Sequence, residues 1–240
     1  MRKGTIFQYE CKRLLFSREY LLLLVATVLY CVSLLRGVVL YGVNFTAPFS
    51  PLTFSSYCAG LAPFLFVLLL VLCARQLKPS EYGVERLISG TPLPLPTFRL
   101  LRYGSVACAF LLAAAWSVLL CFVFYWQVFD YTAVSGLLGW ALLFLLPPAV
   151  FLFGAAMFLG SRKTVAVYIL LAAVFILSVF PIPLPGVVNF TGNTVLQLLP
   201  ANGQAFVLPT AFLLGRMAFV IAGVCLLLAS LHKSSQFQNG

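Results

Sequence analysis

The chain has 240 residues, of which 62% are hydrophobic and 8% are charged, and its mean hydropathy is +1.07. A soluble globule of this length needs more polar surface than this composition supplies, so a soluble enzyme or soluble binding module is excluded. The net charge of +10 could suit nucleic acid, but the basic residues stand in short clusters between apolar runs and indicate membrane topology instead.

A charged head precedes the first apolar run and occupies residues 1–19. Phe7, Cys11 and Leu14 recur in it at helical spacing, and Glu10 and Arg13 supply charge between them. This pattern predicts an amphipathic helix that lies in the membrane interface. The head has no clear cleavage site for a signal peptidase, so we expect the first apolar run to remain as a helix.

Six apolar runs follow, each close to the 20 or so residues that a bilayer core of roughly 30 Å requires. They cover residues 20–41, 54–74, 103–129, 136–160, 164–180 and 211–231 approximately. The loops between them are too short for a soluble catalytic domain. We therefore predict an all-α integral membrane protein that forms one six-span domain over residues 1–240.

Thirteen of the fifteen basic residues fall on one side of this topology. They are Arg2, Lys3, Lys12, Arg13, Arg18, Arg75, Lys78, Arg86, Arg99, Arg102, Arg162, Lys163 and Lys233. The positive-inside rule places that side, and with it both termini, in the cytoplasm. The other two, Arg36 and Arg216, lie in the outer halves of their spans, and we expect their side chains to extend to the outer interface.

The polar residues that membrane catalysis or ion coupling would need are scarce. The acids and the single histidine are Glu10, Glu19, Glu81, Glu85, Asp130 and His232. None falls near the middle of a predicted span, so the chain offers no intramembrane base, metal site or ion relay. It also lacks the spacing of a phosphate-binding loop, so energy for transport would have to enter from another chain. The seven cysteines are scattered through apolar runs and suit packing rather than disulfides or metal ligation.

Residues 75–102 form the longest predicted loop on the basic side, and they contain an amphipathic segment. Ser80 can cap a short helix, and Glu81 in its first turn suits the helix dipole. Val84, Leu87 and Ile88 then share one apolar face. Gly90 and the prolines at 92, 94 and 96 end the helix in a stiff strap. By itself this segment is either a connecting helix on the lipid headgroups or a peg that docks into a partner.

The run of Glu81, Gly83, Glu85, Leu87 and Thr91-Pro92, followed by an apolar stretch that ends at Arg102, resembles the first cytoplasmic loop of ABC-2 type ABC transporter permeases. The opening FQYECKRLLFSREYLLLL, which bears Glu10 and Arg13, is similar to the amphipathic head of the same family. The likeness extends over essentially the whole chain.

This resemblance implies that two permease subunits, identical or paralogous, form a pathway between them and couple to cytoplasmic ABC ATPase subunits. The segment in the 75–102 loop would then be the coupling helix. Val84, Leu87 and Ile88 would seat in the ATPase groove, and Glu81, Glu85 and Arg86 would lie at its rim. The head residues Phe7, Glu10, Cys11, Arg13 and Leu14 would be a second contact with the ATPase, or else a plain membrane anchor. ATP and Mg²⁺ are expected in the partner ATPase, with no cofactor, metal or catalytic residue in this chain.

The expected function is that of a non-catalytic exporter subunit in a bacterial plasma membrane, in contact with lipid and without a nucleic acid partner. Because the spans carry few polar side chains, a hydrophobic or amphipathic cargo such as a peptide, an antibiotic or a lipid-like molecule fits best. The alternative is a scaffold or assembly factor that transports nothing and recruits a different cytoplasmic partner. The outer loop, residues 181–210, either lies on the surface or dips a short helix at 196–199 into the outer leaflet.

Two features are expected to shape the spans themselves. Pro147-Pro148 should kink the fourth span, because proline removes helix hydrogen bonds. Small residues at four-residue spacing permit close contacts between helices. These pairs are Ser56 with Gly60, Ala109 with Ala113, and Ala156 with Gly160.

Overall fold

The computed structural model describes residues 3–43, 46–77, 94–180, 189–193, 196 and 208–236. Over these residues the chain is helical and contains no strand. The elements are α1 (Lys3–Leu15), α2 (Arg18–Leu34), the π-helical turn η1 (Leu35–Val39), α3 (Pro51–Gln76), α5 (Leu95–Phe129), α6 (Ser135–Gly160), α7 (Val165–Val179) and α9 (Thr210–Gln236). The predicted all-α class agrees with this architecture.

Five of the described helical segments are long and apolar enough to cross a bilayer. They are Arg18–Val39, Pro51–Gln76, Pro96–Phe129, Ser135–Gly160 and Thr210–Leu231. They coincide with the first four predicted spans and the sixth, as expected of a multi-pass membrane protein. The predicted fifth span corresponds to α7, which has 15 residues. At 1.5 Å per residue α7 is about 22 Å long, shorter than a bilayer core of roughly 30 Å, so a sixth crossing stays a prediction.

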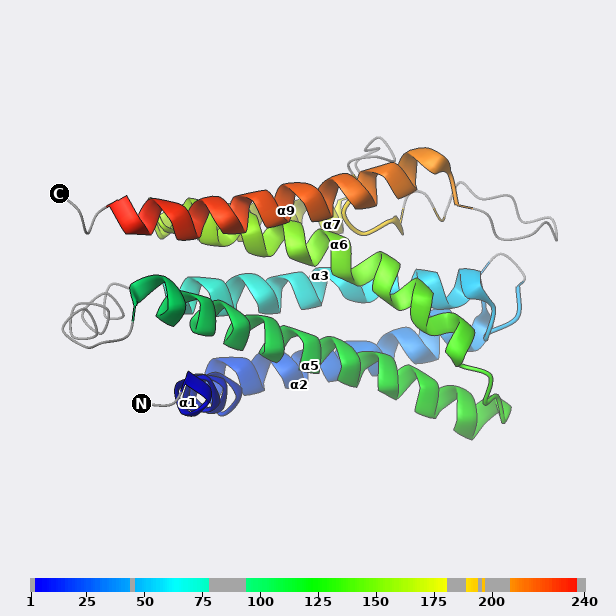
Figure 1. The fold of residues 1–240 in the computed structure, drawn as a ribbon. Helices are drawn as coiled ribbons and strands as arrows, with labels where there is room; N and C mark the ends of the chain where they lie inside the picture. The colour runs from blue at the N-terminus through cyan, green and yellow to red at the C-terminus, as the bar shows by residue number, and fades with distance from the viewer. Residues whose placement is uncertain are drawn as a thin grey trace.

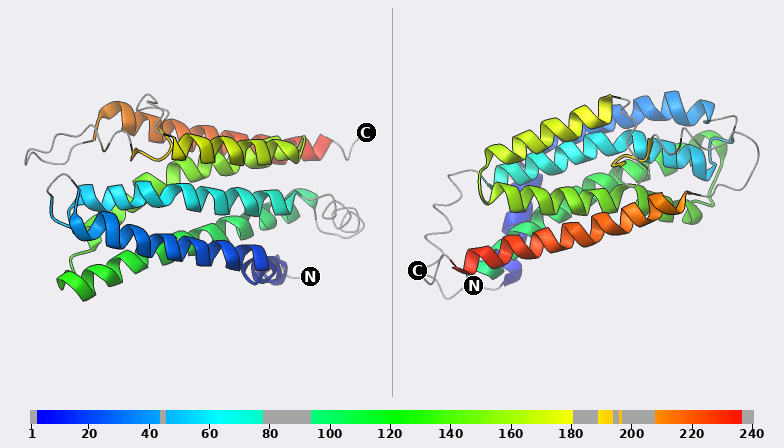
Figure 2. Two further views of the ribbon diagram at one scale, coloured as in Figure 1. Left: turned by 180° about the vertical axis from the view of Figure 1, so that it is seen from behind. Right: turned by 90° about the horizontal axis from the view of Figure 1, so that it is seen from above.

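The long helices lie side by side around α3, while α1 is turned across their direction (Figures 1 and 2). α3 contacts α2, α5, α6 and α7. Of its apolar window 72% is buried within the protein, against 22% for the spans of α2 and α9. The core is therefore built on α3, and α2 and α9 present most of their surface outward.

One end of the bundle gathers the start of α1, the end of α3, the start of α5, the turn between α6 and α7, and the end of α9 (Figures 1 and 2). We call it the basic end, because its described residues include Arg75, Arg99, Arg102, Arg162 and Lys163. The other end is called the opposite end. The structure thus brings together basic residues that are far apart in the sequence, as the topology predicted.

Two helix starts are set by local chemistry. Ser50 precedes α3, and its hydroxyl accepts a hydrogen bond from the Thr53 amide at 3.2 Å. α5 begins at Leu95, earlier than the predicted residue 103, with Pro96 in its first turn. Proline is tolerated there because a first-turn amide has no helical acceptor. Pro96 and Arg99 therefore belong to α5, and the predicted loop of residues 75–102 is shorter than its sequence suggested.

α6 continues through Pro147 and Pro148, both of which are buried. Figure 1 shows that the helix changes direction near its middle, which is where the two prolines stand in the sequence. The observed bend agrees with the predicted kink, since each proline removes one backbone hydrogen bond of the helix.

α6 and α9 approach each other backbone to backbone at Gly154 and Gly223. A Cβ atom added to Gly154 would lie 2.3 Å from the carbonyl oxygen of Gly223, and one added to Gly223 would lie 2.5 Å from that of Val150. The pairs predicted from four-residue spacing have other neighbours: Gly60 lies against the Leu34 side chain, and Gly160 against Leu77 and Val167. Gly160 thus makes a close contact, as its spacing predicted, whereas the backbone-to-backbone contact at Gly154 and Gly223 was not among the predicted pairs.

We expect Gly154→Ala to lower the thermal unfolding temperature of the purified protein, because the obstructing atoms are backbone and cannot rotate away. Gly139→Ala, in the same helix, is the matched control, since nothing lies within 4 Å of its added Cβ. It should leave stability unchanged or raise it by up to about 1 kcal/mol through helix propensity. Equal unfolding temperatures for the two variants would contradict this packing of α6 on α9.

Candidate functional site

The predicted coupling residues lie in the segment 78–93, outside the described residues. They are Glu81, Val84, Glu85, Arg86, Leu87 and Ile88. Their helical form and their contacts therefore stay predictions. The structure does describe the two helices that this segment joins, namely the end of α3 and the start of α5, and how the surrounding elements hold them.

The end of α3 is attached to the turn between α6 and α7. The backbone carbonyl of Leu77 accepts a hydrogen bond from the Thr164 hydroxyl at 3.1 Å. The Leu77 side chain fills the space beside Gly160, where an added Cβ would lie 2.2 Å from Leu77 Cδ1. The end of α3 therefore cannot shift without moving this turn.

The start of α5 is attached to the same end of α3 through a buried arginine. Arg102 is 4% exposed, and its Nη2 donates a hydrogen bond to the Gln76 carbonyl at 3.1 Å. Its guanidinium also lies 5.7 Å from the centroid of the Phe98 ring. Because Gln76 is the last residue of α3, the cation also meets the negative end of the helix dipole.

An ion pair between Glu19 and Arg75 joins α2 to α3. The two side chains are 47% and 26% exposed, so the pair contributes only about 0–1 kcal/mol to stability. The pair shows that the start of α2 lies beside the end of α3.

α1 crosses the basic end (Figure 1), but its apolar face is turned toward the bundle. Leu14 is fully buried, and the Phe7 ring lies 3.3 Å from the position of a Cβ on Gly104 of α5. Glu10 is 5% exposed and lies 3.0 Å from Arg13 Nη2. The head forms a helix as predicted, but Phe7 and Leu14 pack on the protein instead of facing lipid.

The turn from α1 to α2 is fixed by Ser17. Its hydroxyl donates to the Leu14 carbonyl at 2.7 Å and accepts from the Tyr20 amide at 3.3 Å. One side chain thus satisfies a carbonyl at the end of α1 and an amide at the start of α2. A change in the position of α1 would therefore be passed to the first span.

We call the residues that make these attachments the basic-end frame. They are Glu10, Arg13, Ser17, Glu19, Arg75, Gln76, Leu77, Arg102 and Thr164. The set contains no cysteine or histidine, and no group of three His, Cys, Asp or Glu side chains suited to a metal occurs among the described residues. The frame holds α3, α5, α1 and α2 in one arrangement around the two ends of segment 78–93.

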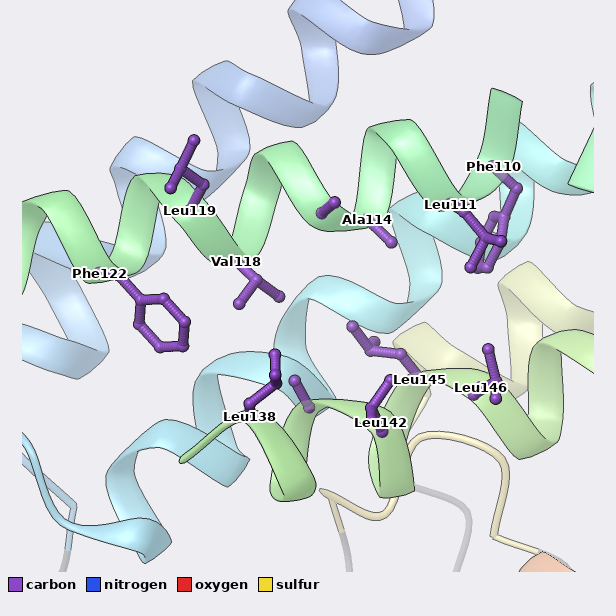
Figure 3. A pocket seen from close by; sticks show the side chains of 12 residues that line it. Phe110, Leu111, Ala114, Val118, Leu119, Phe122, Leu138, Leu142, Leu145 and Leu146 are labelled. Carbon is purple, nitrogen blue, oxygen red and sulfur yellow. The ribbon is translucent and has the colours of Figure 1, made fainter. Parts of the chain in front are cut away.

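A second feature is an apolar pocket of about 250 Å³ between α5 and α6 (Figure 3). Several of its leucines are about half exposed, so the pocket opens on the face of the bundle that would meet lipid. Figure 3 shows Val118 and Phe122 of α5 and Leu138 and Leu145 of α6 directed into the space between the helices. Its lining also includes Phe110, Leu111, Ala114, Ala115, Leu119, Ala141, Leu142 and Leu146.

The two isolated arginines have different surroundings. Arg36 is exposed, and its extension to the outer interface stays a prediction. Arg216 is 2% exposed, and its Nη1 donates to the Phe190 carbonyl at 2.9 Å. The prediction that the Arg216 side chain reaches the outer interface is therefore wrong. The sequence signal for its burial is weak, because the covering residue Phe190 belongs to the outer loop and not to the same helix.

Comparisons with protein-family models, with curated proteins and with solved structures give no match to this chain. The likeness to ABC-2 permeases therefore depends on the sequence residues quoted above.

Docking of α1 on α5 can be tested through Cys11 and Cys108. Burial raises the pKa of the Cys11 thiol to about 11, with smaller contributions from the Cys108 thiol, which hydrogen-bonds to it, and from Glu10. In a variant that keeps only these two cysteines, a short bifunctional thiol reagent should bridge them, as an intact mass measurement would reveal. Because only the thiolate reacts, the rate should keep rising with pH beyond 9, where an ordinary cysteine levels off.

A variant that keeps Cys11 alone is the control and should take up the reagent without forming a bridge. Failure of the two-cysteine variant to bridge at pH 10 would contradict the packing of α1 on α5.

Proposed function

We propose that this chain is the permease subunit of an ATP-driven ABC-2 type exporter, with segment 78–93 as the element that receives force from a separate cytoplasmic ATPase. The observation that supports this proposal best is the basic-end frame. Both ends of the segment are attached to neighbouring helices, through Thr164 at Leu77 and through Arg102 at Gln76. A force applied to the segment would therefore be transmitted to α3 and α5.

The force would spread from α3. This helix is the most buried span and contacts α2, α5, α6 and α7. A displacement of its end by ATPase closure would be shared among these helices, because closely packed interiors transmit strain. The bias between two conformations would come from different contacts of Val84, Leu87 and Ile88 with the ATPase in each state.

In this proposal the basic end faces the cytoplasm of a bacterial cell, and the opposite end faces outward. The excess of Arg and Lys at the described basic end supports that orientation. α1 would lie at the inner membrane surface. Tyr9 in α1 is 67% exposed and Phe16, directly after it, is 72% exposed. These aromatic side chains could meet headgroups or the ATPase.

A second permease, identical or paralogous, would complete the pathway, and the cargo would be hydrophobic or amphipathic. The apolar lining of the pocket between α5 and α6 supports a cargo of that class. ATP and Mg²⁺ would bind to the partner ATPase and not to this chain.

The first test of the proposal is the identity of the proteins that bind this chain. The tagged chain should be purified from its native membranes in mild detergent, and every chain that copurifies should be identified by mass spectrometry. An ATP-hydrolysing subunit without membrane spans is the expected companion. A partner set that contains no such ATPase would favour the scaffold alternative and overturn the proposal.

In the copurified complex, Leu87→Asp should abolish the stimulation of ATP turnover by the permease, because a carboxylate cannot enter an apolar groove without a large desolvation cost. Leu87→Met keeps the size and apolar character and should retain stimulation. Both variant permeases should insert into the membrane and fold normally, as size-exclusion chromatography of the permease would show. Undiminished turnover in the assembled Leu87→Asp complex would reject the coupling role of this segment.

A further inference from the structure

Arg216 is a buried cation near the opposite end of the bundle, in the second turn of α9. Only its Nη1 has a hydrogen-bond partner, the Phe190 carbonyl at 2.9 Å. Its Nε and Nη2 are buried and make no hydrogen bond. Burial of a charged side chain that is 2% exposed, with two donors that have no partner, is costly.

The two unpartnered donors share one edge of the planar guanidinium. The N–H of Nε and one N–H of Nη2 point in parallel, and this fork matches the two oxygens of a carboxylate or a phosphate. Nη1, on the other side, already donates a hydrogen bond to the Phe190 carbonyl. The free part of Arg216 is therefore a complete bidentate oxyanion donor.

No acid of the described chain neutralises this charge. Glu10 and Glu19 form ion pairs with Arg13 and Arg75 at the basic end. Arg216 is about 30 Å from the end of α9 at that side, by the helical rise over its remaining 20 or so residues. Asp130, which ends α5 at the opposite end, is exposed and forms no ion pair with Arg216.

Three aromatic rings partly compensate the charge. The Arg216 guanidinium carbon lies 4.4 Å from the centroid of Phe212, 5.8 Å from that of Phe144 and 5.9 Å from that of Phe219. Cation–π contacts offset part of the desolvation cost, but they satisfy neither N–H of the free edge. Phe144 and Phe212 are buried and Phe219 is partly exposed, so a ligand would meet these rings only after the turn that covers them has moved. They would then form an apolar wall that suits a ligand with an oxyanion head and an apolar body.

The backbone turn at residues 189–192 covers the free edge. Asn189 Oδ1 accepts from the Gly192 amide at 2.9 Å, and Gly192 has φ of +82°, a left-handed conformation that favours glycine. A Cβ on Gly192 would lie 3.2 Å from Arg216 Nη2 and 2.5 Å from the Phe144 ring. Access to the edge therefore requires this turn to move, and Arg216 itself holds the turn through one hydrogen bond to Phe190.

We propose that Arg216 is the anion-binding residue of a site for an amphiphile, at the opposite end of the bundle. The ligand presents a carboxylate or phosphate to the Nε–Nη2 edge and lays its apolar part against the Phe144, Phe212 and Phe219 rings. The oxyanion supplies the counter-charge that the described chain lacks. The site stands independently of the exporter proposal, because it depends on the surroundings of Arg216 alone.

The test uses the full chain in nanodiscs of phosphatidylcholine, to which phosphatidylglycerol or oleate is added, and follows unfolding by tryptophan fluorescence. We expect the oxyanionic amphiphile to raise the Tm of the wild-type protein by about 2–4 °C. For a chain of this size, that shift corresponds to a roughly fivefold change in the equilibrium constant of unfolding. Arg216→Met should abolish that rise. In pure phosphatidylcholine the same variant should be at least as stable as the wild type, because it removes a buried charge that has no counter-charge among the described residues.

Arg36→Met is the matched control, since Arg36 also lies in an apolar span, far from the basic end, but is exposed. It should keep the full response to the anionic amphiphile. Arg216→Lys keeps the charge but lacks the fork, so it should lose most of the response, and it serves as the informative variant if Arg216→Met does not fold. A response confined to phosphatidylglycerol would identify a lipid phosphate as the ligand, and one confined to oleate a carboxylate.

Three results would overturn the site. These are no response of the wild-type protein to either probe, a response that persists in Arg216→Met or in full in Arg216→Lys, and an equal loss of response in Arg36→Met. The last result would mean that any outer arginine attracts anionic amphiphiles.

Discussion

The low polarity of the bilayer core decides where this chain can place each charged or hydrogen-bonding group. In hydrocarbon an unsatisfied backbone or side-chain polar group costs several kcal/mol, so the spans must be helices and their polar side chains must find partners inside the protein. Tyr57 donates to the Ser117 carbonyl at 2.8 Å, and Tyr20 donates to that of Ala109 at 3.0 Å. Charge is thereby displaced to the two ends, where the functional proposals lie.

The charged side chains at the two ends of the bundle have different kinds of partner. At the basic end, each described frame charge has a partner: Glu10 has Arg13, Glu19 has Arg75, and Arg102 has the carbonyl at the end of α3. These contacts join neighbouring helices at that end. Arg216 at the opposite end has one carbonyl and three rings but no counter-charge. The first arrangement suits mechanical coupling, and the second suits binding of an anion.

Sequence patterns predicted the structural features that neighbouring residues determine, such as the spans. They missed the contacts between segments that are far apart in the chain. Apolar run length located five spans, because the bilayer sets that length directly. The predicted start of α5, at residue 103, is later than the observed start at Leu95. The pattern is ambiguous because a proline such as Pro96 fits a non-helical connection and also the first turn of a helix. The Gly154–Gly223 contact and the burial of Arg216 each need two segments far apart in the chain. No local spacing encodes either, and the coupling residues themselves lie outside the described part.

α6 connects the basic-end frame with the surroundings of Arg216. At the basic end Gly160 lies against Leu77, and toward the opposite end the Phe144 ring lies beneath Arg216. Between these points Gly154 meets Gly223 of α9, the helix that carries Arg216. Because backbone contact at Gly154 leaves little freedom to slide, a displacement received at Leu77 would move α6 and α9 together on that side of the proline bend. The bend at Pro147-Pro148 lies between this contact and Phe144. It is therefore the place where a motion of the basic end would be converted into a change in the surroundings of Arg216.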